Sequence, residues 1–360
     1  MQATIRLKLT PDQETSEILA QTARQYTWAF NDVCYYGWQN NIKNGIKLHD
    51  ATYRYHRDVT DLPSQLVCSA RVKAGEAIKS AMALNKKEKT VSCPNSKHCA
   101  IRYDARSYTV WWNDKRLSLV TLKGRLKFQY EIADYYQQYQ GWKTTSADLF
   151  KDRSGRWWLH IVKQTESPEF SATEQVVGVD LGEINPACDN RGNFYGNPEW
   201  KKIEDKVFQL RRRLQSKGTR SAKRHQKKLS GKQKRFRRDC DHVLSKRLVQ
   251  SVEPGAIIVF EDLTNIRGSA KKRKAQRRRF HGWSFKQFQN FVAYKAERKG
   301  VLVKYVDPRY TSQKCSSCGH ISRSNRPSQA VFKCKKCAYS NHADLNASIN
   351  IRADYLKQSR

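Results

Sequence analysis

Three acidic residues stand where the chain could build a metal-dependent hydrolytic site. Asp180 ends the apolar run VVGVD and Glu261 ends AIIVFE, so each carboxylate is expected at the end of a buried strand. Asp344 lies at the start of the last helical pattern, ADLNASINI. Taken singly, such acids are usually solvated loop residues or charges at a helix N-terminus. Acids at strand ends can also point into one cleft, so the combination indicates a site.

The chemistry that such a trio fits is phosphodiester hydrolysis. This reaction needs a water molecule deprotonated near neutral pH and a stabilised leaving oxyanion, and two divalent ions about 4 Å apart provide both. Mg²⁺ and Mn²⁺ require oxygen ligands, for which three carboxylates make an economical cage. We therefore expect Asp180, Glu261 and Asp344 to be catalytic residues that bind Mg²⁺ or Mn²⁺.

Four of the ten cysteines form a metal-binding pattern. Cys315 and Cys318 make one knuckle, and Cys334 and Cys337 make a second knuckle fifteen residues later, which is the spacing of a zinc ribbon. All four coordination positions would be filled by thiolates, so the expected zinc is structural, since a catalytic zinc keeps one position open. The scatter of most other cysteines favours a reducing compartment over a disulfide framework.

A second metal site is a weaker hypothesis. Cys93, His98 and Cys99 offer three ligands within a short segment. No fourth ligand is evident, so unliganded side chains are the favoured interpretation.

The charge of the chain indicates a polyanionic partner. Lysine and arginine number 69 against 33 acids, a formal charge of +36, and nucleic acid is the simplest explanation of such a surface. The segments RSAKRHQKKLSGKQKRFRR (220–238) and KKRKAQRRRF (271–280) are the best candidates for contacts. The sequence contains no apolar run of about 18 residues that could span a membrane, and its start lacks a signal peptide. A cytoplasmic, nucleoid-associated protein is expected.

The first half of the sequence predicts a barrel with a helical insertion. Residues 3–9 alternate as a strand, and Thr10, Pro11 and Gln13 predict a helix start. Two apolar stripes predict two helices before residue 88. Short alternating runs between about 100 and 165 predict a compact β-barrel whose first strand is residues 3–9.

The second half predicts a different architecture. Its order is a strand at VVGVD, a hairpin, a helical pair at 199–249, a strand at AIIVFE, a helix from Ser284 to Gly300, a strand, the cysteine segment and a last helix. Acids after the first strand, after a later strand and on the last helix are the arrangement of an RNase H-type core.

The segment from about 176 to 352 resembles the TnpB (OrfB) family of transposon-encoded proteins, which are relatives of miniature type V CRISPR effectors. The matching motifs are GVDLG, FEDL, the helix that begins WSF and ends YKAERKG, the run VDPRYTSQKCSSCG, the knuckle CKKC, and DLNASINI. The match covers about half of the chain. The first half resembles the family in layout only.

The resemblance implies a multidomain fold of α/β plus β-barrel class. An RNase H-like (RuvC) core with an inserted zinc ribbon would follow a β-barrel wedge domain that carries a helical insertion. The implied boundaries are 1–10 and 89–168 for the wedge domain, 11–88 for the helical recognition domain, 175–309 and 341–360 for the RuvC domain, and 310–340 for the zinc ribbon.

The resemblance also implies a function, that of an RNA-guided DNA endonuclease. Its partners would be a guide RNA and double-stranded target DNA with a short adjacent motif, and Asp180, Glu261 and Asp344 would be the metal ligands. A transposon protein and a miniature CRISPR effector are not separable from one chain. Two alternatives are a guide-independent transposase and a DNA-binding regulator that does not cleave.

Overall fold

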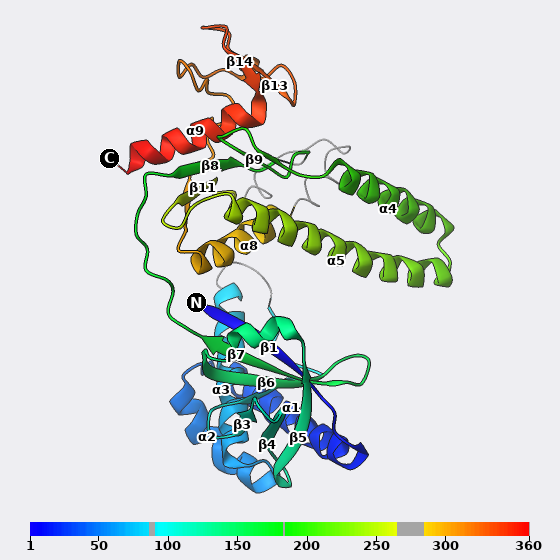
Figure 1. Cartoon of the computed structure of the whole chain (residues 1–360). Helices are drawn as coiled ribbons and strands as arrows, with labels where there is room; N and C mark the ends of the chain where they lie inside the picture. The colour runs from blue at the N-terminus through cyan, green and yellow to red at the C-terminus, as the bar shows by residue number, and fades with distance from the viewer. Residues whose placement is uncertain (86–90, 183, 265–283, 360) are drawn as a thin grey trace. The chain divides into compact units, whose positions relative to one another are not determined.

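The chain folds into two compact units. The structure, a computed structural model, describes residues 1–85, 91–182, 184–264 and 284–359 (Figure 1). Unit 1 is Met1–Glu166 and unit 2 is Ser167–Arg360. In the described residues no helix is long and apolar enough to cross a membrane.

Unit 1 is built on an antiparallel sheet of seven strands in the order β2-β6-β7-β1-β5-β4-β3. The strands are β1 (Gln2–Leu9), β2 (Ile101–Tyr103), β3 (Tyr108–Trp111), β4 (Arg116–Thr121), β5 (Gly124–Ile132), β6 (Lys143–Lys151) and β7 (Trp157–Gln164). The edge strands β2 and β3 follow each other in the chain, and the Tyr103 hydroxyl donates to the Val120 carbonyl at 3.1 Å, so the sheet is a nearly closed barrel. Since β1 pairs with both β5 and β7, the predicted first strand of the barrel is confirmed.

Three helices are inserted between β1 and β2: α1 (Gln13–Gln39), α2 (Gly45–Val59) and α3 (Ser64–Asn85). A 3₁₀ turn, η1 (Asp134–Tyr139), follows β5. The predicted helix start at Thr10 and Pro11 is wrong, because Asp12 is the N-cap and accepts from the Thr15 amide at 2.8 Å. Helix α2 was not predicted, since its buried positions, Leu48, Thr52 and His56, include only one apolar residue.

Unit 2 is built on a mixed sheet of five strands in the order β10-β9-β8-β11-β12. The strands are β8 (Val176–Asp180), β9 (Ala187–Asp189), β10 (Phe194–Tyr195), β11 (Ile257–Glu261) and β12 (Leu302–Val306). Strands β8, β11 and β12 are parallel, whereas β9 and β10 continue the sheet as the predicted antiparallel hairpin. The carboxyl ends of the parallel strands therefore meet at one edge.

Helices cover both faces of this sheet (Figure 1). They are α5 (Arg220–Gln250) and α8 (Phe285–Arg298) on one face and α9 (Ala343–Gln358) on the other, while α4 (Pro198–Lys217) packs along α5. Val179 and Phe260 pack with α5 and α8 on one face, and Val259 packs with Ile351 of α9 on the other. Because successive strand residues point to opposite faces, β8 and β11 are buried on both sides, whereas the edge strand β12 is partly exposed.

Helices α4 and α5 form the predicted helical pair. Gly218 ends α4 in the left-handed conformation (φ 63°), and the Thr219 hydroxyl caps α5 by accepting from the Ala222 amide at 3.2 Å. The basic segment 220–238 lies on α5, where most of its lysines and arginines are exposed. The other basic segment, 271–280, lies outside the described residues.

The cysteine segment is inserted between β12 and α9. It contains the 3₁₀ turn η2 (Arg323–Asn325) and a small antiparallel pair, β13 (Val331–Lys333) and β14 (Ser340–His342). Its apolar centre is small, with Phe332 and Ala343 packed against Cys315 and Cys334. Such a segment cannot build a core of its own, so a bound metal is the expected source of its stability.

Candidate active site and metal centre

The strand register brings two of the predicted acids side by side. Val179 of β8 pairs with Phe260 of β11 in parallel, so Asp180 and Glu261 are the next residues of the two neighbouring strands. Both side chains lie on the face of the sheet that α9 covers, because they share the parity of Gly178 and Val259. Both acids are half-buried.

The third acid reaches the same place from the start of α9. Asp344 is buried, with 3% of its surface exposed, and His342 caps the helix just before it. Helix α9 lies very close to β8 at Gly178, where a Cβ atom would be 2.4 Å from the Ser348 carbonyl oxygen. Glycine at position 178 is therefore required for α9 to bring Asp344 to the ends of the strands.

The three carboxylates interact electrostatically. Burial raises the pKa of Asp180 well above its ordinary value, and the neighbouring charges of Glu261 and Asp344 raise it further. Burial also raises the pKa of Glu261, to about 7, although a hydrogen bond from Thr311 and the charge of Arg326 oppose this shift. Burial and mutual repulsion disfavour the charged forms of these carboxylates. A bound cation would stabilise those charged forms.

Three polar residues that sequence reasoning missed hold the acids. The Asn185 amide donates to Asp344 Oδ2 at 2.9 Å, and the Arg326 guanidinium donates to Asp344 Oδ1 at 3.1 Å. The Thr311 hydroxyl donates to Glu261 Oε1. All three come from loops, where no periodic pattern marks a residue that faces the site.

The residues present fit divalent ions of the hard type. The donor set consists of carboxylate oxygens, which are the ligands that Mg²⁺ and Mn²⁺ take.

The four predicted cysteines form a compact cluster. Their Sγ atoms all lie within 4.8 Å of one another, and no other group of this kind occurs within the described residues. The Cys315–Cys337 and Cys318–Cys334 Sγ distances are 3.7 and 3.6 Å. A tetrahedron with Zn–S bonds of about 2.3 Å has edges of about 3.8 Å, so the cluster can bind a structural metal such as zinc. Amide hydrogen bonds lower the pKa of Cys334 to about 6, which favours the thiolate.

Hydrogen bonds fasten the cysteine segment to α9. The Asn346 side chain accepts from the Ser316 amide at 3.0 Å and donates to the Lys314 carbonyl at 2.8 Å. The Asn350 amide donates to the carbonyls of Thr311 and Lys314. The helix that carries Asp344 is thus tied to the residues just before the first knuckle.

The weaker metal hypothesis is not supported by the geometry. Cys93 and Cys99 pack against the apolar cluster around Cys34, whereas His98 is exposed. They do not belong to any cluster of metal ligands found within the described ranges. The favoured interpretation, unliganded side chains, agrees with this packing.

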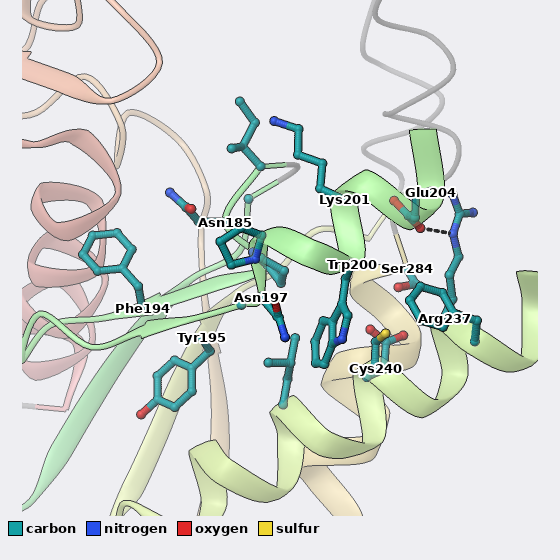
Figure 2. Close-up of a pocket in the computed structure, with 18 of the residues that line it drawn as sticks. Asn185, Phe194, Tyr195, Asn197, Trp200, Lys201, Glu204, Arg237, Cys240 and Ser284 are labelled. Carbon is teal, nitrogen blue, oxygen red and sulfur yellow. Dashed lines mark hydrogen bonds and ion pairs between the residues drawn. The ribbon is translucent and has the colours of Figure 1, made fainter. Parts of the chain in front are cut away.

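A cavity of about 450 Å³ lies between the β9–β10 hairpin and helices α4 and α5 (Figure 2). Asn185, which holds Asp344, also lines this cavity. Trp200 of α4 projects into it, and the ion pair between Arg237 and Glu204, at 2.5 Å, lies at its wall. No feature of the sequence predicted a cavity here.

Comparison with known proteins identifies relatives of this chain. Residues 285–351, from α8 to the middle of α9, match the family described as Cas12f1-like, TNB domain. A TnpB-like protein of Methanocaldococcus jannaschii is 32% identical over 191 residues, which cover 49% of this chain and 68% of that protein. The chain belongs to the TnpB family. The resemblance found in the sequence is thereby confirmed.

Another relative is longer than this chain. The CRISPR-associated endodeoxyribonuclease Cas12f1 of Sulfoacidibacillus thermotolerans is 32% identical over 231 residues, 58% of this chain and 52% of that protein. This TnpB chain thus spans about half the length of that relative.

A solved Cas12f1, in complex with an sgRNA and target DNA, has a similar fold. The TM-score is 0.65 at 16% identity, over 94% of this TnpB chain and 83% of that one. The likeness extends over both units, so the first half of the chain also has the fold of these effectors.

Proposed function

We propose that this protein is an RNA-guided DNA endonuclease whose RuvC site consists of Asp180, Glu261 and Asp344. The observation that carries the proposal is the convergence of these acids, from β8, β11 and α9, at one edge of the unit 2 sheet. The name of the related endodeoxyribonuclease Cas12f1 supports cleavage of DNA.

The proposed core of unit 2 is RNase H-like. In that fold an antiparallel hairpin and two parallel strands flank the first strand, and the order β10-β9-β8-β11-β12 agrees with this arrangement. We propose RuvC parts at 175–309 and 341–360, with the zinc ribbon at 310–340 inserted. Residues 1–10 and 89–168 would then be the wedge domain and 11–88 the recognition domain.

In the proposed mechanism the three carboxylates bind Mg²⁺ or Mn²⁺. Ions bound there would lower the pKa of the attacking water and stabilise the leaving oxyanion. Asn185 and Arg326 each occupy one oxygen of Asp344 and fix its orientation, while Thr311 does the same for Glu261. The low polarity around the partly buried acids would strengthen their attraction for the ions.

The proposal of a guide RNA rests on family membership and charge. The formal charge of +36 suits a protein that holds nucleic acid backbones, and the exposed cations of α5 belong to the same unit as the acids. In guided systems base pairing selects the sequence and the protein holds the backbone. The target would be double-stranded DNA beside a short motif.

The first test removes the acids one at a time. Asp180→Asn, Glu261→Gln and Asp344→Asn should each reduce DNA cleavage by roughly 100-fold or more and leave nucleic acid binding intact, because each removes a metal ligand. Asp262→Asn is the matched control. Asp262 directly follows Glu261, but its side chain is exposed and accepts a hydrogen bond from the Thr264 amide. Cleavage by the wild type should stop in EDTA. Retention of full activity by the three variants would exclude the proposed site.

The second test identifies the bound nucleic acid. RNA extracted from the purified full chain should be one structured species that ends in a variable segment. Protein without RNA that joins or cuts transposon ends would favour the guide-independent transposase. Binding without cleavage in Mg²⁺ or Mn²⁺ would favour the non-cleaving regulator.

A further inference from the structure

The cavity in unit 2 has a lining unlike the rest of this basic chain. Its charged residues are the carboxylates Glu204, Asp205 and Asp241 and the cations Lys201 and Arg237. Arg237 is paired with Glu204 at 2.5 Å. Acids outnumber cations in the lining, although lysine and arginine outnumber acids about two to one in the sequence. A phosphate group would therefore be repelled or held weakly here.

The remaining lining suits a neutral planar ligand with polar edges. The Trp200 indole packs on the apolar core and projects from α4 into the cavity, toward α5 (Figure 2). Aromatic rings of this kind stack on nucleobases irrespective of sequence. Carboxylates accept hydrogen bonds from exocyclic amino groups of bases, and Asp241, buried at 8% exposure, lies in the wall. The volume of about 450 Å³ is within the range of small-molecule sites.

One residue links the cavity to the proposed cleavage site. Asn185 lines the cavity and donates to Asp344 Oδ2 at 2.9 Å. Gly182, two residues after Asp180, lines it as well. The lining of the cavity and the residues that orient the acids therefore share Asn185.

We propose that this cavity binds one unstacked nucleobase of the DNA strand that lies in the cleavage site, with Trp200 as the stacking surface. The proposal rests on the proposed nuclease function, because the acids define where the strand runs. Enzymes that act on nucleic acids hold extruded bases in this way, between aromatic rings and polar groups. The pocket would fix the register of the strand relative to the acids, so Trp200 would be a positioning residue.

The experiment uses the full chain with its copurified RNA. Single-stranded DNA complementary to the variable segment of that RNA is prepared with one abasic site, moved base by base through the region of the cut. At the position whose base enters the pocket, the abasic site should reduce cleavage by the wild type about tenfold, the value of one stacked base. In the Trp200→Leu variant, an abasic site at that position should reduce cleavage little beyond the reduction caused by the substitution itself. Trp200→Phe should restore the wild-type pattern.

The matched control is Ile203→Ala, which changes an exposed apolar residue of the same helix that does not line the cavity. A readout without cleavage is the emission of 2-aminopurine placed at the same positions, measured in EDTA. At the pocket position its emission should change on binding, and Trp200→Leu should alter that change whereas Ile203→Ala should not.

The outcomes separate the two proposals. Equal effects of the abasic site at all positions, or the same pattern in wild type and Trp200→Leu, would overturn the pocket even if Asp180→Asn abolishes cleavage. A position-specific 2-aminopurine signal that depends on Trp200 would support the pocket even if Asp180→Asn still cleaves, in which case only the nuclease assignment fails. Because the abasic series changes the DNA alone, it tests the pocket even if Trp200→Leu misfolds.

Discussion

At the scale of single residues, Arg326 provides positive charge beside the acids. Its guanidinium donates to Asp344, and its charge opposes the burial that raises the pKa values of Asp180 and Glu261. A cation so close to three carboxylates contributes to folding as well as to orientation. Its contribution should be largest when no divalent ion is bound.

We predict that Arg326→Met destabilises the protein by about 1–3 kcal/mol in EDTA, because it leaves a buried carboxylate without its charged partner. The loss should be smaller in saturating Mg²⁺, since bound ions supply positive charge. Thermal unfolding with and without Mg²⁺ measures this difference. Arg323→Met, which alters an exposed arginine of the same loop, is the control. An equal loss in both buffers would contradict the predicted role of Arg326.

The sequence predicted the acids and the cysteines better than it predicted what surrounds them. Asp180 and Glu261 follow apolar runs that only a buried strand explains, so their positions could be inferred from periodicity. Asn185, Thr311 and Arg326 stand in loops and reach the acids through tertiary folding alone. Their contacts depend on how distant segments pack, which no local pattern records.

At the scale of elements, the contact between β8 and α9 sets the geometry of the site. Gly178→Ala should destabilise unit 2 by about 1–3 kcal/mol or more and reduce cleavage, because the added Cβ would lie 2.4 Å from the Ser348 oxygen and 2.6 Å from the Arg352 amide. Denaturant unfolding and cleavage rates measure the two effects. Gly231→Ala on α5 is the control, since its Cβ has ordinary contacts and alanine favours a helix by up to about 1 kcal/mol. Unchanged stability of Gly178→Ala would show that α9 can move freely.

The cysteine segment should act on cleavage through α9. Removal of the metal by a chelator, or Cys318→Ser, should loosen the start of α9 and reduce cleavage by roughly 10–100-fold. Amide hydrogen exchange across 343–351 should rise in parallel, since Asn346 binds Ser316 inside the first knuckle and Asn350 binds Thr311 just before it. Cys68→Ser, a cysteine of α3 outside the cluster, should change neither. If the amides of α9 stay protected from exchange after the metal is removed, the predicted coupling between the cysteine segment and α9 is wrong.

Elements with an apolar period were predicted well, and those without one were missed. The strand that ends in Asp180 and the helix that starts near Phe285 repeat their apolar residues at the expected spacing. Helix α2 instead buries Leu48, Thr52 and His56, a mostly polar stripe that resembles a loop in sequence. The N-cap Asp12 was missed because Thr10 and Pro11 offered a plausible cap two residues earlier.

At the scale of the whole molecule, the charge of +36 predicts strongly salt-dependent binding of nucleic acid. Replacing Lys223, Lys227 and Lys228 of α5 by glutamine should lower the slope of log K against log salt by up to about 0.9 for each lost phosphate contact. Arginine at the same positions keeps the charge and should preserve the slope. Binding titrations at several salt concentrations test this, and an unchanged slope would remove α5 from the interface.

The three acids are distributed along unit 2, and the last of them follows the metal-binding insertion. A nascent or prematurely terminated chain that ends between Glu261 and Asp344 would carry an incomplete set of the proposed ligands. Partial translation products would consequently be harmless to the chromosome. The order of the segments would thus delay any scission of DNA until synthesis has passed the second knuckle.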